Sequence, residues 1–354
     1  GWNSVTFPKS SFLSIRPLPT EAASKRYWPG FVPDGRKMIQ RIIDLIDRYH
    51  KFLITAHVKL DGDALGSELA LCRLLGNLGK DAVVYNQDPT PRSYRFLPGA
   101  DDIVHVLPAP AAFEAAFILD CSELERVGDA APDIGNVRQL VNIDHHVSNH
   151  GFCELRLIDP AASSTGELIF RLLTAMGADI DREMATNLYT AILTDTGGFR
   201  YGNTGREALA AAGFLVGRGA DPQWISENIY EKCPRAKIML MARVMQSLSF
   251  DCGDRVGSLT VLLRDFEEIG ALPEDTEGLV DLPRTIDGVS VSVLFTEIGE
   301  QRFKVSLRSK GTTDVAQVAA VFGGGGHVNA AACRIAGDIA VVKRRLFAAM
   351  RLPE

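Results

Sequence analysis

The chain has 354 residues, a net charge of −6, 46% hydrophobic and 23% charged residues. The length predicts about two domains, and the composition lies in the globular range, which excludes collagen-like and intrinsically disordered classes. The negative charge argues against binding along a long nucleic acid, because that mode needs a basic surface. A small phosphate ligand, which needs only local positive charge, remains open.

The six cysteines are scattered, without a Cys-x-x-Cys pair. This pattern favours reduced thiols over a disulfide framework. No run of residues is long and apolar enough to predict a membrane span, and the N-terminal stretch lacks a secretory signal pattern. We therefore expect a cytoplasmic protein without membrane association. Residues 1–35, rich in Ser and Pro, are expected to form an N-terminal tail.

Short apolar runs alternate with amphipathic helical patterns from residue 36 to about residue 220, which predicts a parallel α/β sheet. The predicted strands are Lys51–Ala56, Ala82–Tyr85, Ala116–Leu119 and Leu140–Ile143. The predicted helix starts are two capping boxes, Ser164-x-x-Glu167 and Thr204-x-x-Glu207, and a capping residue, Asp181, for a helix through Thr194.

The pattern changes after residue 220. Asp221-Pro222 and Pro234 each predict a helix start, so residues 221–249 are expected to form a helical linker. From about residue 250, strand-like runs are followed by helices near 314–322 and 339–350. This part predicts a smaller domain with a mixed sheet.

Three of the predicted strands end directly in carboxylates or imidazoles, and one predicted helix ends in a further carboxylate. These residues are His57, Asp61 and Asp63 after the first strand, Asp120 after the third, Asp144, His145 and His146 after the fourth, and Asp195 at the helix end. In an open parallel sheet, the carboxyl ends of neighbouring strands lie side by side, and ligands bind in the crevice outside them. We therefore expect these side chains to converge, although any single one would be better explained as a cap or a turn residue.

Carboxylates crowded into one crevice repel one another and raise their own pKa values unless cations neutralise them. The number of ligands fits two divalent metal ions. Oxygen ligands with a minority of imidazoles favour Mn²⁺, with Mg²⁺ as the alternative, over zinc. Two metals about 3.5–4 Å apart can generate a hydroxide and stabilise the attacking and leaving oxygens of a phosphoryl displacement. The set therefore predicts hydrolysis of a phosphate ester.

A run of four glycines, Gly323–Gly326, precedes His327 in the predicted second domain. The amides of such a loop can bind an anion, and His327 can add a hydrogen bond. An equally supported alternative is that the glycines only close a turn or allow close packing. Arg308, followed by Ser309 on a nearby predicted strand, could place a guanidinium at a phosphate. Lys304 is better explained as part of a solvated strand face.

Together these motifs resemble those of the DHH–DHHA1 phosphoesterases, over roughly residues 36–352. The matching motifs are His57-x-x-x-Asp61-Gly-Asp63, Asp120-x-Ser122, Asp144-His145-His146, Thr194-Asp195-Thr-Gly and Gly324-Gly325-Gly326-His327. The resemblance implies an α/β fold with an N-terminal DHH domain (36–220), whose parallel sheet carries helices on both faces. It also implies a smaller mixed-sheet α/β DHHA1 domain (250–354), with the active site in the cleft between the two.

The resemblance also implies residue roles. One metal would be held by His57, Asp61 and Asp120, and the other by Asp63, Asp120, His145 and Asp195. Asp144 would orient His145, and His146 would lie close to the scissile phosphate, so that Asp120, Asp144 and His146 form the catalytic set. The residues expected to bind substrate are Arg308, Ser309, Gly324, Gly325, Gly326 and His327. Two departures from the family pattern are Lys59-Leu60 in place of Asn-Pro and Ala332 in place of Gly, of which the second puts substrate choice in doubt.

Within the family, the sequence is most similar to enzymes that hydrolyse very short RNA to mononucleotides and convert pAp to AMP. An alternative is a phosphodiesterase for cyclic or linear signalling dinucleotides. A non-catalytic nucleotide sensor is less favoured, because the implied ligand set is intact. The expected partners are short RNA oligonucleotides or small nucleotides such as pAp, without long nucleic acid or membrane, and a homodimer is compatible with the sequence.

Overall fold

The computed structural model describes residues 33–311 and 313–350, which form two compact units that divide between Lys232 and Cys233. The division falls inside the segment 221–249 that the sequence predicts as a linker. Most of the predicted tail lies outside the described residues, but its last residues do not, because a helix already begins at Pro33. Within the described ranges, no helix combines the length and the apolar character needed to cross a lipid bilayer.

The first unit is built on a five-stranded sheet of order β2-β1-β3-β4-β5, in which all neighbours are parallel. The strands are β1 (Lys51–Thr55), β2 (Asp81–Val84), β3 (Ala115–Leu119), β4 (Leu140–Asp144) and β5 (Leu155–Ile158). Four of them lie where the sequence predicts strands. The edge strand β5 was not predicted, because Arg156 points to solvent and interrupts the apolar run that marks the central strands.

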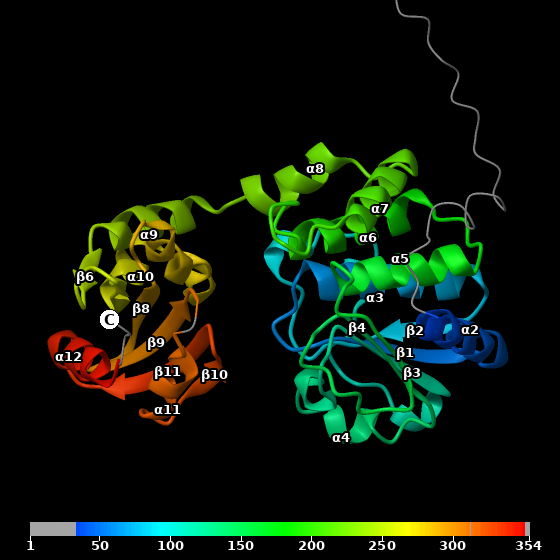
Figure 1. Ribbon diagram of the computed structural model, residues 1–354, viewed down its shortest axis with the longest axis horizontal. Helices are drawn as coiled ribbons and strands as arrows, with labels where there is room; N and C mark the ends of the chain where they lie inside the picture. Colours follow the sequence, from blue (N-terminus) through cyan, green and yellow to red (C-terminus); the bar gives the residue numbers. More distant parts are fainter. Residues whose placement is uncertain (1–32, 312, 351–354) are drawn as a thin grey trace, which may run out of the picture. The chain divides into compact units, whose positions relative to one another are not determined.

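Helices cover both faces of this sheet, as predicted (Figure 1). They are α2 (Pro33–Arg48), α3 (Gly62–Asn77), α4 (Ala131–Ile134), α5 (Thr165–Ala175), α6 (Arg182–Asp195), α7 (Arg206–Gly217) and α8 (Pro222–Ser226). Helices α2, α3, α5 and α6 share one large core with Phe52, Ile54 and Phe117 of the sheet. The short helix α4 packs on the opposite face, against Leu53 and Ile118.

Two of the three predicted helix caps are present. The Ser164 hydroxyl accepts from the Glu167 amide at 3.0 Å, and the Asp181 carboxylate accepts from the Met184 amide at 2.9 Å. The predicted capping box at Thr204 is wrong. Helix α7 begins one residue later than predicted, with Gly205 as its N-cap residue and no side-chain cap, and the Thr204 amide donates to the Tyr201 carbonyl in the preceding turn.

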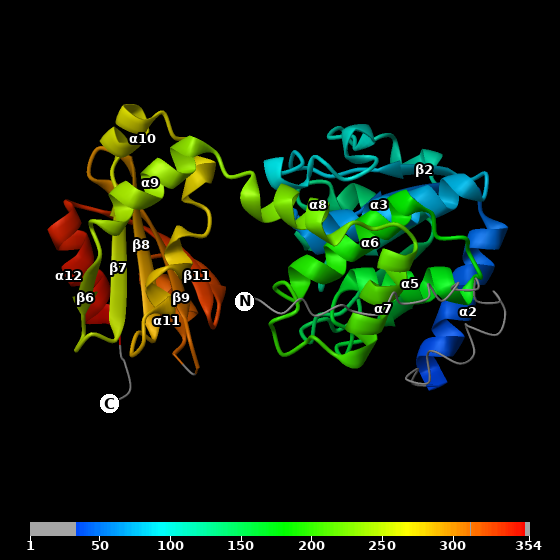
Figure 2. The same cartoon turned by 90° about the horizontal axis from the view of Figure 1, so that it is seen from above.

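The second unit contains a six-stranded mixed sheet of order β10-β11-β9-β8-β7-β6, in which only β7 and β8 are parallel. Figure 2 shows β6, β7, β8, β9 and β11 following one another in this order. The strands are β6 (Ser249–Asp251), β7 (Val256–Val261), β8 (Val291–Gly299), β9 (Arg302–Ser309), β10 (Gly325–His327) and β11 (Ala330–Ala336). The prediction of a mixed sheet is confirmed.

Four helices cover the second sheet. They are α9 (Arg235–Met245), α10 (Leu263–Ile269), α11 (Val315–Ala320) and α12 (Ile339–Ala349). Helices α11 and α12 form a core with Phe303, Val305 and Leu307 of β9. Helices α9 and α10 form a separate core with Leu259 of β7 and Leu294 of β8, on the other face.

Candidate metal centre

The three central strands of the first sheet, β1, β3 and β4, are direct neighbours, so the segments that follow them lie together at one edge of the sheet. Asp120, which follows β3, has a backbone φ of +55°. A non-glycine residue in this left-handed region costs on the order of 1 kcal/mol or more, and such strain persists where the surroundings fix the conformation. The chain therefore turns abruptly at Asp120 and keeps its buried carboxylate next to the ends of β1 and β4.

His57, Asp61 and Asp120 form the first group of candidate ligands. The Nε2 atom of His57 lies 3.1 Å from Asp120 Oδ2 and 3.7 Å from Asp61 Oδ2. The other ring nitrogen, Nδ1, lies 2.9 Å from the carbonyl oxygen of Val58. If Nδ1 donates to this carbonyl, Nε2 is the atom left for a cation. Asp61 also caps α3, because its Oδ1 accepts from the amides of Asp63 and Ala64.

Asp63, His145 and Asp195 form the second group. His145 Nε2 lies 3.7 Å from Asp63 Oδ2 and 3.5 Å from Asp195 Oδ2. Within each group, one possible ligand atom per residue lies within 4.8 Å of the others. His145 Nε2 is also 3.6 Å from Asp120 Oδ1, so Asp120 faces both groups.

The electrostatics of the centre are dominated by crowded carboxylates. Burial raises the pKa of Asp63 well above its usual value, and the charges of Asp120 and Asp195 raise it further. Burial likewise raises the pKa of Asp195 to about 6. Burial opposes the ionised form of Asp120 too, but hydrogen bonding and charge from His57 hold its pKa down to about 2. The carboxylates are thus only partly neutralised by the imidazoles.

These residues fit divalent cations. Burial disfavours a charged His57, yet the hydrogen bond to Asp120 and the Asp61 charge raise the His57 pKa to about 9. Protons therefore occupy positions that a cation would take, and a cation bound there would replace them. The donors are oxygens with a minority of imidazole nitrogens, which is the ligand set of Mg²⁺ and Mn²⁺ sites.

Asp144 contacts a different histidine from the one expected. Its Oδ1 lies 2.7 Å from His146 Nδ1, and its Oδ2 accepts from Asn149 Nδ2 at 2.7 Å. Asp144 therefore supports His146, because the chain after β4 turns the ring of His146 back onto it, and the expectation that Asp144 orients His145 stays a prediction. The hydrogen bond to Asp144 raises the pKa of His146.

Helix α5 contributes residues that the sequence did not indicate as part of the site. The Thr165 hydroxyl donates to Asp120 Oδ1 at 3.0 Å, and the Thr165 and Gly166 amides donate to the two oxygens of Asp63 at 2.7 and 2.8 Å. The capping box Ser164-x-x-Glu167 was the available signal, because a helix N-terminus presents free amides to an anion. What the sequence could not show is that this N-terminus points at Asp63.

Glu68 of α3 is a second buried group that the sequence did not indicate. Its Oε2 accepts from Asn86 Nδ2 at 2.9 Å, and Asn86 Oδ1 accepts from the Ala56 amide at 3.3 Å, next to His57. Its Oε1 is buried without a hydrogen-bond partner. Burial raises the pKa of Glu68 to about 8. The hydrogen-bonded Glu68 and Asn86 side chains thus connect α3 to the end of β1.

The Lys59-Leu60 departure is accommodated without loss of a candidate ligand. Lys59 has a φ of +62°, and its amide donates to Asp88 Oδ2 at 2.6 Å. Leu60 is buried in the core. The two residues therefore shape the turn between His57 and Asp61.

The predicted substrate-binding residues lie in the second unit, around β9, β10 and β11. Arg308 is half-buried, and its guanidinium donates to the Leu307 carbonyl at 3.0 Å. Ser309 is buried, and its hydroxyl donates to the Thr313 carbonyl at 2.7 Å and accepts from Asn329 Nδ2 at 2.9 Å. The Ser309 hydroxyl therefore stabilises this loop in the described structure.

The glycine run is not the open loop that was predicted. Gly325–His327 form strand β10, and the amides of Gly323 and Gly324 already donate to carbonyls of α11. A Cβ atom at Gly324 would lie 2.2 Å from the Ala332 carbonyl oxygen, and one at Gly326 would lie 2.4 Å from that of Ala330. The close approach of β10 to β11 thus requires glycine at both positions, as the alternative interpretation held.

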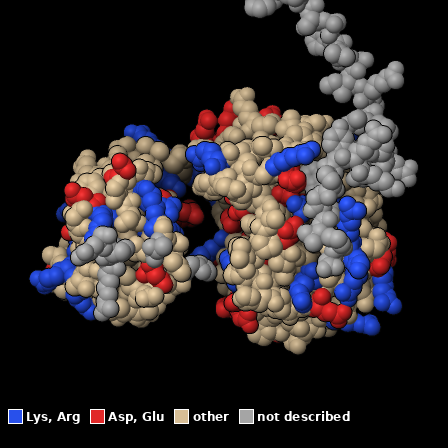
Figure 3. All heavy atoms as spheres, viewed as in Figure 1, with Lys and Arg blue, Asp and Glu red and all other residues tan. Residues whose placement is uncertain are grey.

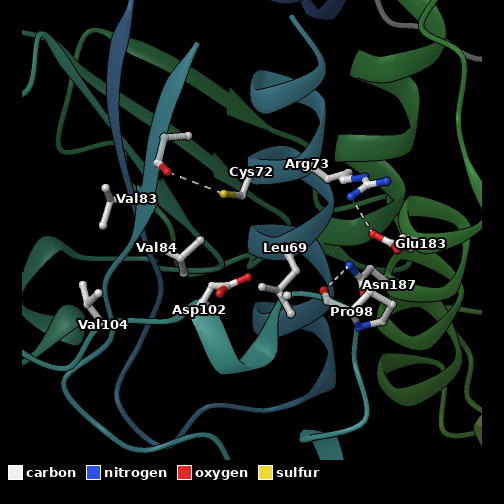
Figure 4. A pocket seen from close by; sticks show the side chains of 12 residues that line it. Leu69, Cys72, Arg73, Val83, Val84, Pro98, Asp102, Val104, Glu183 and Asn187 are labelled. Carbon is white, nitrogen blue, oxygen red and sulfur yellow. Dashed lines mark hydrogen bonds and ion pairs between the residues drawn. The ribbon is translucent and has the colours of Figure 1, made fainter. Parts of the chain in front are cut away.

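A cavity of about 300 Å³ lies elsewhere in the first unit, between β2, α3 and α6 (Figure 4). No candidate metal ligand lines it. Its one guanidinium, of Arg73, is paired with Asp181 and Glu183 at its rim. The cavity is therefore separate from the chemistry of the metal centre.

Comparisons with known proteins agree with this geometry. Residues 51–192 match the "DHH family, N-terminal domain", and residues 259–350 match the "DHHA1 domain". A relative from Thermus thermophilus, the bifunctional oligoribonuclease and PAP phosphatase NrnA, is 35% identical over 93% of this chain and 96% of its own length. The NrnA protein of Bacillus subtilis is 26% identical over 82% of this chain and 91% of its own length.

A solved structure is similar as well. The exopolyphosphatase-related protein of Bacteroides fragilis superposes with a TM-score of 0.82 and 29% identity, over 89% of this chain and 95% of its own. The strand ends, the clustered carboxylates and imidazoles, and these matches lead to one conclusion. The chain belongs to the DHH–DHHA1 family and is a metal-dependent phosphoesterase.

Proposed function

We propose that this enzyme hydrolyses very short RNA to mononucleotides and removes the 3′-phosphate of pAp to give AMP. The observation that carries the proposal is the presence of two adjacent ligand groups, with Asp120 of the first lying 3.6 Å from His145 of the second. The chain that holds them is 35% identical over most of its length to an oligoribonuclease and PAP phosphatase. The net charge of −6 supports a short substrate. Figure 3 shows acidic and basic side chains interspersed on the visible face of each unit. This mixture also argues against a continuous basic surface that binds long nucleic acid.

Two divalent ions fit the two groups, with His57, Asp61 and Asp120 around one and Asp63, Asp120, His145 and Asp195 around the other. We propose Mn²⁺, because both groups contain an imidazole, with Mg²⁺ as the alternative. Such ions would supply Lewis acidity and an activated water to a phosphoryl displacement. That chemistry requires the two groups to stay at a fixed separation.

The remaining residues position the centre and handle protons. The amides at the start of α5 hold Asp63 in one orientation, and the Thr165 hydroxyl does the same for Asp120. The hydrogen bond to Asp144 raises the pKa of His146, which favours the protonated ring, the form that can donate a proton to a phosphate oxygen or to the leaving oxygen. We assign Asp144 and His146 this proton-holding role.

We propose that Arg308 in the second unit binds a substrate phosphate away from the bond that is cleaved. The predicted position of the active site between the two units stays a prediction, as do the homodimer and the roles of Ser309 and of Gly324–His327. Six free cysteines support a reducing compartment, and we propose the cytoplasm.

A product assay with Mn²⁺ tests the function. It offers pAp, a 5′-labelled RNA dinucleotide, a pentanucleotide and a cyclic dinucleotide in parallel. Mononucleotides from RNA together with AMP from pAp are expected. Preferential cleavage of the cyclic dinucleotide would instead favour a signalling phosphodiesterase, and nucleotide binding without turnover of any substrate would favour a sensor.

A further inference from the structure

One face of the second sheet carries a group of basic residues that neither core explains. In the register of β9 and β11, Lys304 lies opposite Arg334, and Arg308 lies opposite Ala330. Because Phe303, Val305 and Leu307 point into the core beneath α11 and α12, the alternating residues of β9 point to the other face. Lys304, Arg308 and Arg334 therefore share this face.

The surface between these cations is made of small residues. Ser306 lies opposite Ala332, between the Lys304–Arg334 pair and Arg308. On this face, the residues buried beneath α9 and α10 come from β7 and β8. Leu294 of β8, which lies opposite Ser306 of β9, is one of them. Lys304 and Arg334 are exposed, and Ser306, Ala330 and Ala332 are partly exposed. An extended ligand can thus approach this strip, which consists of Lys304, Arg334 and Arg308 around a floor of small residues.

The pairing of Lys304 with Arg334 is unfavourable for the fold alone. Side chains directly opposite on antiparallel strands have Cβ atoms about 4.5–5.5 Å apart, and like charges there are destabilising. Among the described residues, neither side chain forms an ion pair with an acidic group. A repulsive pair on a solvent-accessible face is explained if an anion binds between the two cations.

Lys304 and Arg308 lie four residues apart on one strand, which corresponds to about 13 Å at 3.3 Å per residue. At that spacing, their charges favour a chain of phosphates over a single phosphate group. We propose that this basic strip binds the backbone phosphates of a short RNA beyond the bond that is cleaved, so that it sets the preference for oligonucleotide length. The proposal rests on the proposed function and assigns Lys304 a role beyond a solvated strand face.

The test compares wild type with Lys304→Ala, Arg334→Ala and the double variant. Arg344→Ala is the matched control, because Arg344 is exposed on α12, which packs on the opposite face of the sheet. For each protein, KM and kcat are measured with pAp, a dinucleotide and a pentanucleotide at several salt concentrations. Binding of a fluorescent pentanucleotide to the metal-free protein is measured in parallel.

In the double variant, we expect KM for the pentanucleotide to rise about tenfold and the log–log salt slope to fall by about 0.7 per lost phosphate contact. The KM for pAp should change by less than about twofold, because pAp has no further backbone to reach the strip. Arg344→Ala should behave as wild type. The melting temperature of Lys304→Ala should not fall, because a repulsion is removed.

Equal KM changes for pAp and the pentanucleotide, or an unchanged salt slope in the double variant, would contradict RNA binding by the basic strip. Either result would leave the proposed function intact. If wild type cleaves no RNA, the proposed function fails. The measured binding of the fluorescent pentanucleotide still tests whether the basic strip binds RNA. Weaker pentanucleotide binding by the double variant, with Arg344→Ala binding as wild type, would then support the proposal, and equal binding by all five proteins would overturn it.

Discussion

The Gly166 amide donates to Asp63 Oδ1 at 2.8 Å, so a residue at the start of one helix fixes a carboxylate at the start of another. Helix N-termini carry a partial positive charge, which stabilises the ionised form of Asp63 against the repulsion around it. A Cβ atom at residue 166 would lie 2.4 Å from Ala191 Cβ of α6. The glycine therefore allows α5 to approach closely enough to place its amides on Asp63.

Replacing Thr165 with Val tests the support that α5 gives to Asp120. The change removes the hydroxyl that donates to Asp120 Oδ1 at 3.0 Å but keeps the amide that donates to Asp63. Loss of such a partner of a metal-binding group commonly reduces metal affinity or activity by about 10–100-fold. We expect a reduction of this size in activity titrated against Mn²⁺. Thr165→Ser, which keeps the hydroxyl, should retain most of the affinity for Mn²⁺. Equal Mn²⁺ titration curves for Thr165→Val and wild type would contradict the support of Asp120 by this hydroxyl.

Replacing Asp144 with Asn tests how His146 holds its proton. Asp144 raises the pKa of His146 by hydrogen bonding and charge, so in the variant this pKa should fall toward its ordinary value near 6.5. His146 would then lose its proton at a lower pH, and the alkaline limb of the rate profile should move to lower pH if that proton is used. NMR titration of the ring protons in metal-free protein, assigned with His146→Gln, measures the shift. An unchanged titration would show that Asp144 does not control His146.

Replacing Asp195 with Asn should separate stability from metal binding. The pKa of Asp195 is raised from 3.8 to about 6, so its ionisation destabilises the folded state. The loss in the free energy of unfolding grows from about pH 4 to pH 6 and is constant at higher pH. At pH 7.5, the metal-free variant should be more stable than wild type by up to about 3 kcal/mol. Addition of Mn²⁺ should raise the melting temperature of wild type and raise that of the variant much less. A full metal-induced increase in the variant would remove Asp195 from the ligand set.

Replacing Glu68 with Gln should change the pH dependence of folding. Its pKa is raised from 4.5 to about 8 by burial, so the unfolded state releases this proton at a lower pH than the folded state. The free energy of unfolding of wild type should therefore fall between about pH 4.5 and pH 8. At pH 8, the variant should be more stable by an amount on the order of a few kcal/mol, with little difference at pH 4. Urea denaturation at pH 4, 6 and 8 measures this, with the exposed Glu123→Gln as a control that should show no such trend.

The sequence predicted the parts of the structure that depend on local patterns. Continuous apolar runs indicated four buried parallel strands, and the polar residues directly after three of them indicated the metal centre, because parallel strands bring their carboxyl ends together. The cap at Asp181 was predicted for the same local reason. The strand β5 was not predicted, because the exposed Arg156 interrupts its apolar run, whereas the other edge strand, β2, has Ala82, Val83 and Val84 in sequence.

Contacts between distant segments were beyond the sequence patterns. Thr165 and Asp120 are 45 residues apart, and their hydrogen bond depends on how α5 packs on the sheet. The contact of Asp144 with His146 was not predicted, because neighbouring His145 and His146 differ only in the direction that the turn after β4 gives each ring. The glycine run was predicted as a loop because its pairing partner, β11, is recognised only from the strand register.

Every candidate metal ligand, from His57 to Asp195, belongs to the first unit, whereas Arg308 and the basic strip belong to the second. If Arg308 and the basic strip bind substrate as proposed, bond cleavage and recognition of the rest of the substrate are encoded in separate, consecutive stretches of the chain. On that proposal, a substitution on β9 or β11 would alter which nucleotides are accepted without disturbing the centre that breaks the ester. Selectivity and reactivity would then be separable by substitutions in different units of the chain.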